Sequence, residues 1–107
     1  MTTKTESTFW ARIYMSGPIE IAKQVCRKEC LEIGLCVTID PTNFIYTGGE
    51  EAGFVVGIIN YPRFPSGKAS ITAKATALAH ELLEATHQHS WLVVTPDRTT
   101  WYSIRDN

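Results

Sequence analysis

The sequence predicts one α+β domain of the ferredoxin-like type, with the order β-α-β-β-α-β, an antiparallel sheet, two helices on one face and a short extra C-terminal strand. Three observations support this fold class. A strand-like alternation near the N-terminus precedes a helical stripe, a long apolar hairpin occupies the middle, and a second helical stripe precedes further strand-forming residues. At 107 residues the chain has room for one core, and we expect a flexible leader at residues 1–7 and a single domain at residues 8–107.

The composition excludes several classes of protein. A formal net charge of -1 provides no basic footprint for a nucleic-acid backbone, so general DNA or RNA binding is not expected. The N-terminus is polar and the apolar runs are too short to cross a bilayer, which indicates a cytoplasmic protein that does not contact a membrane. The 3 cysteines form no CxxC pair and no even-numbered framework, so reduced thiols are expected.

Residues 8–15 alternate with the period of two that is typical of a strand with two unlike faces. The core set is Phe9, Ala11, Ile13 and Met15, and the opposite face carries Trp10, Arg12 and Tyr14. The following helix begins after Ser16-Gly17, with Pro18 at its first position, and Gly34 ends it. Its predicted buried stripe is Ile19, Ala22, Cys26, Cys30 and Ile33.

The middle of the chain predicts a β-hairpin. Residues 35–39 form a strand that breaks or bulges at residues 40–42, where the missing N–H of Pro41 implies a kink or an edge position, and it resumes at residues 44–46. Residues 47–51, TGGEE, are the predicted turn, because a glycine pair adopts positive φ at little steric cost. The third strand, residues 53–61, is apolar throughout, as in a central or interface strand.

The last third of the chain repeats the order of helix and strand. A loop at residues 62–68 leads into a helix whose predicted buried stripe is Ile71, Ala75, Leu78, Leu82 and Ala85. Residues 91–95 predict a fourth strand, and residues 99–104 a short last strand that pairs with it. Either Trp91 or Leu92 then faces away from the helices.

The sheet face away from the helices and the hairpin turn are the predicted contact surface. Aromatic residues and arginine are the usual anchors of protein interfaces, and charged tips help orientation. An aromatic face of this width is more than a monomer ordinarily exposes, so we expect a protein partner, or a second copy in a homodimer, to cover it. The predicted partner-binding residues are Trp10, Arg12, Tyr14, Glu50 and Glu51.

Two further clusters suggest ligands. Polar residues gather where a loop meets the second helix, and they predict an alternative anion-binding site at Arg63, Ser66, Lys68 and Ser70. Residues 65–68 resemble the end of a phosphate-binding loop, although Pro62 stands where that motif requires glycine. His80, Glu84 and His87 share one helix face without forming a known zinc motif, so the sequence indicates a solvated face, no metal and no cofactor.

No pairing of a nucleophile with a base emerges from the spacing, which favours a non-enzymatic interaction module. In overall build the chain resembles small phage-encoded inhibitor proteins, including anti-CRISPR types, which bind and block a larger host complex such as a nucleic-acid-processing defence system. That resemblance implies a protein partner bound through the residues named above. The alternative is a ferredoxin-like domain, regulator or enzyme, that dimerises through its sheet and holds a small molecule or anion.

Overall fold

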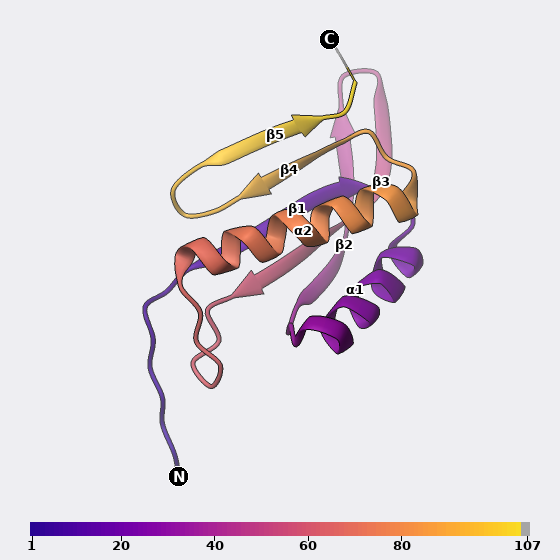
Figure 1. Cartoon of the computed structure of the whole chain (residues 1–107). Coiled ribbons are helices and arrows are strands. Elements are labelled where there is room, and N and C mark those ends of the chain that lie inside the picture. The colour runs from indigo at the N-terminus through magenta and orange to yellow at the C-terminus, as the bar shows by residue number, and fades with distance from the viewer. Residues whose placement is uncertain (106–107) are drawn as a thin grey trace.

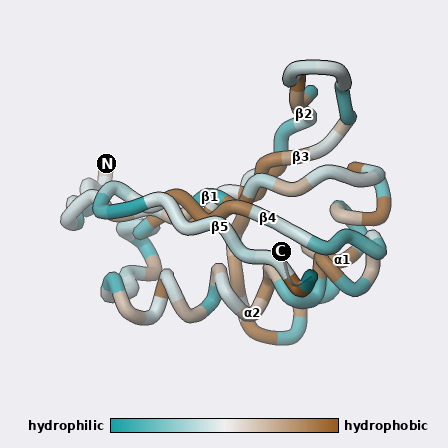
Figure 2. Tube along the Cα trace, turned by 90° about the horizontal axis from the view of Figure 1, so that it is seen from above, coloured by the Kyte–Doolittle hydropathy of each residue, from teal (hydrophilic) through white to brown (hydrophobic). Residues whose placement is uncertain are grey.

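The computed structural model describes residues 1–105, which form a five-stranded sheet and two helices (Figure 1). The elements are β1 (Trp10–Ser16), α1 (Ile19–Ile33), β2 (Thr38–Tyr46), β3 (Gly49–Ile59), α2 (Lys68–Thr86), β4 (Ser90–Val94) and β5 (Thr99–Ser103). The strand order is β2-β3-β1-β4-β5, and every neighbouring pair is antiparallel. Both helices lie on one face of the sheet (Figure 2). The predicted ferredoxin-like plan with an added C-terminal strand is therefore confirmed.

β1 is the central strand, between β3 and β4, and its alternation separates the two faces of the sheet as predicted. Ala11, Ile13 and Met15 are buried under the helices, at 0%, 0% and 1% exposure. Phe9 precedes the strand and is also buried. Trp10 and Tyr14 are half-buried on the opposite face, which neither helix covers (Figure 2).

α1 begins and ends as predicted, but its buried stripe is narrower than predicted. Gly34 adopts φ 70° and its N–H donates to the Cys30 carbonyl oxygen at 3.0 Å, which ends the helix. Of the predicted stripe, Ala22 and Cys26 are buried, whereas Ile33 is 49% exposed. The reason is position: α1 lies beside α2 near the edge of the sheet, so its last turn extends past the core (Figure 1).

The β2–β3 hairpin differs from the prediction in two ways. β2 begins at Thr38, and it continues through Pro41 without a break, because it is an edge strand and the missing proline N–H removes no ladder hydrogen bond. The turn contains only Thr47 and Gly48, whose φ of 85° suits glycine. Gly49–Ile59 is all strand, so both predicted turn glutamates lie within β3. The outer half of the hairpin rises from the sheet on the side away from the helices (Figure 2).

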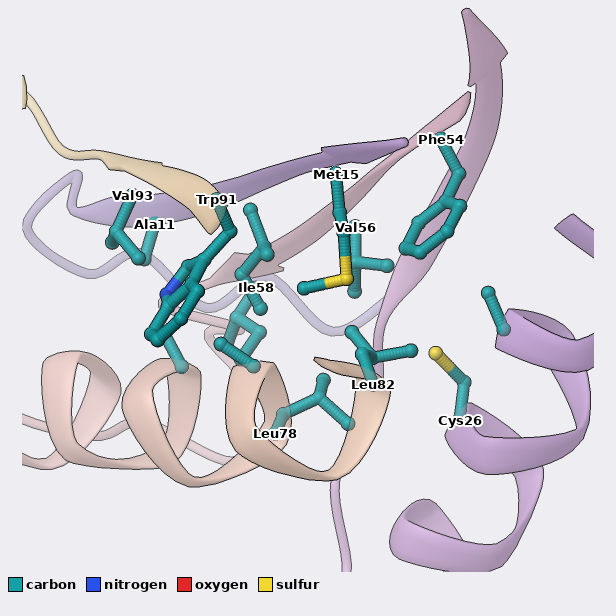
Figure 3. Close-up of a cluster of buried hydrophobic side chains, with 14 of the residues drawn as sticks. Ala11, Met15, Cys26, Phe54, Val56, Ile58, Leu78, Leu82, Trp91 and Val93 are labelled. Atoms are coloured by element: carbon teal, nitrogen blue, oxygen red, sulfur yellow. The ribbon is translucent and has the colours of Figure 1, made fainter. Parts of the chain in front are cut away.

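The core lies between the sheet and α2 (Figure 3). Leu78 and Leu82 of α2 are buried beneath Met15 and Val56, as the helical stripe predicted. The buried hydroxyl of Thr86 donates to the Leu82 carbonyl oxygen at 2.7 Å, so this polar side chain is satisfied inside the core. The remaining members of the predicted stripe are Ile71 and Ala75, which are buried, and Ala85, which is half-buried.

The β4–β5 hairpin extends the sheet beyond the helix layer. Trp91 is 6% exposed and faces the helices, so Leu92 is the residue that faces the open side. Tyr102 of β5 stacks on Trp91, with ring centroids 5.0 Å apart. Neither helix in residues 1–105 combines the length and the apolar character that a membrane-spanning helix requires.

Candidate functional site

The sheet face opposite the helices, here called the open face, carries an aromatic surface. Arg12 lies over the Trp10 ring, with its guanidinium carbon 4.2 Å from the ring centroid, which is the geometry of a cation–π contact. Tyr14 is paired with Val55 on one side and Leu92 on the other. The predicted residues of β1 therefore do share one face.

Two further apolar residues belong to this face and were missed by the sequence analysis. Trp101 is opposite Leu92 in the β4–β5 ladder and is 57% exposed, and Ile59 is opposite Trp10 and is 50% exposed. The alternation of side chains along a strand places Trp101 on the same face as Leu92, but only once the pairing register of β4 and β5 is known. The two-residue repeat alone does not provide that register.

A polar cluster forms where the hairpin bends away from the sheet. Ser16, the last residue of β1, donates its hydroxyl to Oε2 of Glu51 on β3 at 2.7 Å. Tyr46, the last residue of β2, lies next to the same carboxylate. We call Ser16, Tyr46 and Glu51 the bend cluster. It joins the ends of three strands, so three distant parts of the sequence hold one carboxylate in place.

Electrostatics in the bend cluster favour the protonated phenol of Tyr46. The pKa of Tyr46 is raised by partial burial first, then by the negative charge of Glu51 and by a hydrogen bond with that carboxylate. The phenol therefore remains a hydrogen-bond donor throughout the physiological pH range. A carboxylate flanked by two hydroxyl groups is well suited to face a cationic ligand.

Two glycines of β3 allow the aromatic side chains to approach the bend. A Cβ at Gly53 would meet the Met15 carbonyl oxygen and would lie 2.6 Å from a ring carbon of Phe44. A Cβ at Gly49 would lie 2.7 Å from the ring of Tyr46. These rings thus lie directly across the backbone of β3, and glycine is required for that contact.

A hollow of about 310 Å³ adjoins the bend. It lies where the start of α1 meets the base of the hairpin, and Gly17, next to Ser16, is part of its wall. The other lining residues are Pro18, Ile19, Pro41, Thr42, Asn43, Ala52 and Gly53. A volume of this size is near the lower end, roughly 300 Å³, of known small-molecule sites.

The two predicted hairpin glutamates have different surroundings. Glu51 belongs to the bend cluster, whereas Glu50 pairs with Ile45 on the other side of β3, and both of those side chains are exposed. The sequence placed both carboxylates in the turn. Both are exposed, but they lie within β3, where adjacent residues point to opposite faces.

The predicted anion site is dispersed. Ser66 and Lys68 line a common hollow, but Arg63 lines another, next to Thr2 and Lys4. The Ser66 backbone N–H is already used, because it donates to Oδ1 of Asn60 at 2.9 Å. Ser70 lines neither of these hollows, so the four residues do not form one cradle, although Lys68 lines two hollows.

Residues suited to metals or redox chemistry are spread out in the structure. Within residues 1–105, no three side chains of the His, Cys, Asp or Glu types lie close enough to hold a metal ion. His80 contacts the Trp91 ring edge-on at 5.4 Å, and His87 ends α2 with φ 56°. Burial raises the pKa of the Cys26 thiol to about 11, with a smaller contribution from neighbouring Cys30, so Cys26 behaves as a core residue.

Comparison with known proteins identifies a fold but no family. No protein-family model matches the chain, and no curated protein matches it. A phage SAM lyase in complex with S-methyl-5′-thioadenosine has the same fold, with a TM-score of 0.74, 18% identity and coverage of 96% of this chain and 95% of that chain. The apo state of a phage SAM lyase has a TM-score of 0.70 at 19% identity, over 100% of this chain and 98% of that chain.

A weaker likeness links the chain to the periplasmic divalent cation tolerance protein CutA from Archaeoglobus fulgidus, with a TM-score of 0.46, 14% identity and coverage of 94% of this chain and 85% of that chain. At these identities, the SAM lyase structures establish that the fold is shared from end to end. They do not establish an activity for this chain.

Proposed function

We propose that this chain is an enzyme of the SAM lyase class, which cleaves S-adenosylmethionine and releases S-methyl-5′-thioadenosine. One combined observation supports it: the fold of a phage SAM lyase extends over 96% of this chain, and the chain holds a hydrogen-bonded carboxylate at the bend of its sheet. Because one fold supports many functions, the proposal also requires that the residues of the bend cluster suit this reaction.

The chemistry depends on charge and orientation more than on acid–base catalysis. S-adenosylmethionine carries a positive sulfonium. Release of S-methyl-5′-thioadenosine requires that the bond from this sulfur to the four-carbon amino-acid chain breaks, with the electron pair passing to sulfur. The carboxylate of the same chain is able to close on the carbon that sulfur leaves, which forms a lactone without water or an external proton. A protein accelerates such a step by holding the reacting atoms together and placing a carboxylate near the cation.

The bend cluster supplies these requirements. Glu51 provides the carboxylate, and the hydroxyl of Ser16 occupies one of its oxygens at 2.7 Å, which fixes the direction of the other. Tyr46 adds a phenol that stays protonated because its pKa is raised by burial and by Glu51. The rings of Phe44 and Tyr46 offer apolar surface for the adenosyl group. We assign Glu51 as the cation-facing group and Ser16 as the residue that positions it.

The test is to incubate the purified protein with S-adenosylmethionine and to measure S-methyl-5′-thioadenosine by liquid chromatography and mass spectrometry. Glu51→Gln should lower kcat roughly 100-fold, the usual loss when a preorganised electrostatic group is removed. Glu50→Gln is the matched control, because it removes the same charge one residue away on the opposite side of β3. Absence of product with the wild-type protein, or equal activity of both variants, would refute the proposal.

A second candidate function is binding of a protein partner at the open face. The exposed Trp101 and Ile59, together with the stacked Trp10–Arg12 pair, favour it, since a contiguous apolar surface of this kind commonly marks an interface. Under this proposal the chain is an inhibitor of the small phage-encoded type, or it associates with a second copy through the same face. Tyr14 and the two hairpin glutamates would then contact the partner.

The two functions separate in one experiment. A tagged wild-type protein is used to recover partners from host cells, next to an Arg12→Glu variant whose substitution lies on the open face but outside the bend cluster. Loss of a recovered host complex in the variant, with no lyase product from the wild type, would favour the inhibitor. Product formation that Arg12→Glu leaves intact would favour the lyase.

A further inference from the structure

A groove on the helix side of the sheet lies apart from the bend cluster. Because β5 extends past the helix layer, a groove of about 680 Å³ opens between α2 and β5. Phe9 and Val93 are among its lining residues and are buried, at 5% and 6% exposure. The α2 wall is low because its side chains are small: Ala69, Thr72, Ala73 and Thr76. The volume lies within the range of roughly 300–1,000 Å³ that is typical of small-molecule sites.

The groove carries an excess of positive charge. Lys68 and Arg98 are two cations against one carboxylate, that of Asp97. Neither cation forms an ion pair in the part of the chain that the structure describes, where the ion pair present is Lys23–Glu20. Two unpaired cations beside an apolar floor favour a ligand that is anionic at one end and apolar at the other.

The Lys68 side chain and the backbone of Arg98 are both ordered by neighbouring contacts. The Lys68 ammonium lies 5.6 Å from the centroid of the Phe9 ring, above the groove floor. Arg98 is the last residue of a closed turn, in which the Thr95 hydroxyl accepts hydrogen bonds from the N–H groups of Asp97 and Arg98 at 3.3 Å each. The Thr95 N–H donates to the Arg98 carbonyl oxygen at 2.9 Å. The backbone that carries these side chains is therefore ordered before a ligand binds. This order lowers the entropy cost of binding.

The groove also contains a stacking surface. Tyr102 lines its β5 side and stacks on the buried Trp91, with an interplanar angle of 13°. Tyr102 is 37% exposed, so part of its ring remains accessible to solvent. A flat heteroaromatic ring placed on Tyr102 would continue the stack, as nucleobases do on aromatic side chains.

We propose that this groove binds a nucleoside monophosphate, with the base against Tyr102 and the phosphate between Lys68 and Arg98. The combination of a flat aromatic group and a compact anion is what the groove complements. The site is separate from the bend cluster, because its walls belong to α2 and the β4–β5 hairpin. It would therefore be a second ligand site on the same chain.

The test is calorimetric titration of the wild-type protein with adenosine monophosphate, adenosine and inorganic phosphate. The monophosphate should bind more tightly than either fragment. Arg98→Ala and Lys68→Ala should each weaken it roughly tenfold, as expected for the loss of one charge-assisted hydrogen bond. Tyr102→Leu should weaken the monophosphate and adenosine together, while leaving any binding of phosphate unchanged.

Lys74→Ala is the matched control, because Lys74 is a lysine of the same helix that lines a different hollow. Equal affinity of the Arg98→Ala, Lys68→Ala and wild-type proteins, or no heat with the monophosphate at millimolar concentration, would overturn the proposal. Glu51→Gln should bind the monophosphate normally. If Glu51→Gln loses lyase product but still binds the nucleotide, or Arg98→Ala loses nucleotide binding but still forms product, the two sites are independent. A failure of one proposal is then distinguishable from a failure of the other.

Discussion

The two faces of β3 show how one strand serves two purposes. Phe54, Val56 and Ile58 point towards the helices and are 0%, 0% and 3% exposed. The alternate residues include two buried glycines, Gly53 and Gly57, and no large aliphatic side chain fully enclosed by neighbours. On the face towards the helices, close packing requires large apolar side chains. On the opposite face, the small residues leave room for neighbouring rings and for the bend cluster. The same strand therefore contributes to the core on one side and to the candidate site on the other.

The largest effect is expected from Phe54→Ala, on the covered face. Phe54 is among the largest fully buried side chains, so truncation should lower the free energy of unfolding by about 3–5 kcal/mol. Val55→Ala is the control on the open face, where half-burial limits the loss to about 1 kcal/mol. Urea unfolding of both variants measures the contrast. Equal losses would mean that the open face is covered in solution.

A smaller loss is expected from Gly53→Ala. The added methyl group would press on the Met15 carbonyl oxygen and the Phe44 ring, and such overpacking costs about 1–3 kcal/mol. Gly57→Ala provides the comparison, because its methyl group would meet only the Thr38 hydroxyl, which is free to rotate away. Thermal unfolding should place the Gly53 variant clearly below the Gly57 variant. The opposite order would contradict the described contact between Phe44 and β3.

The pH dependence of stability should reveal the burial of Cys26. Because burial raises its pKa from 9.0 to about 11, the folded state keeps the thiol protonated while the unfolded chain begins to lose the proton near pH 9. This contribution to stability is complete below pH 9 and is lost as the pH rises towards 11. The loss amounts to roughly 2 kcal/mol. Denaturation between pH 8 and 11 measures it by comparison with Cys26→Ala, in which the loss of stability should be smaller by this amount.

Cys36 provides the control for that measurement. Its thiol is exposed, so Cys36→Ala removes a cysteine without changing the packing around Cys26. A thiol reagent at neutral pH should modify Cys36 first and Cys26 only on unfolding. Rapid modification of Cys26 in the folded protein would contradict its place in the core.

The smallest effect on stability is expected from Tyr14→Glu, in the centre of the open face. Tyr14 is half-buried, so the free energy of unfolding should change by about 1 kcal/mol or less. If a second copy covers this face, the variant should instead reduce the mass measured by size-exclusion chromatography with light scattering. A wild-type protein that is already monomeric would remove the homodimer from consideration.

The sequence was sufficient for those parts of the fold that depend on local pattern. The period-two alternation of residues 9–15 and the positions of Pro18 and Gly34 correctly located β1 and both ends of α1. Their signals lie within a few residues of the structure that they specify. Proline at position 41 was correctly associated with a sheet edge, although it does not interrupt β2.

The bend cluster was not accessible to the same reasoning. Glu51 was assigned to the turn because the glycine pair was placed at its centre, whereas the turn is Thr47-Gly48 and β3 begins at Gly49. Ser16 was interpreted only as the end of a strand. Its contact with Glu51 exists because β1 and β3 pair in one particular antiparallel register, and a register is a long-range property that composition does not encode.

The ladder between β1 and β3 starts only at Gly53, opposite Ser16, so Gly49–Ala52 pair with β2 alone. Beyond the bend, the hairpin is a two-stranded ribbon, and the Gly17 N–H, just after β1, donates to the carbonyl oxygen of Ala52 at its base at 3.0 Å. The length of this ribbon is consequently not fixed by pairing with β1. Inserting one residue pair, one on each arm, would raise the tip by one step of the ladder while the core keeps its register. Evolution is thereby able to adjust the reach of this ribbon towards a partner or substrate without repacking the domain.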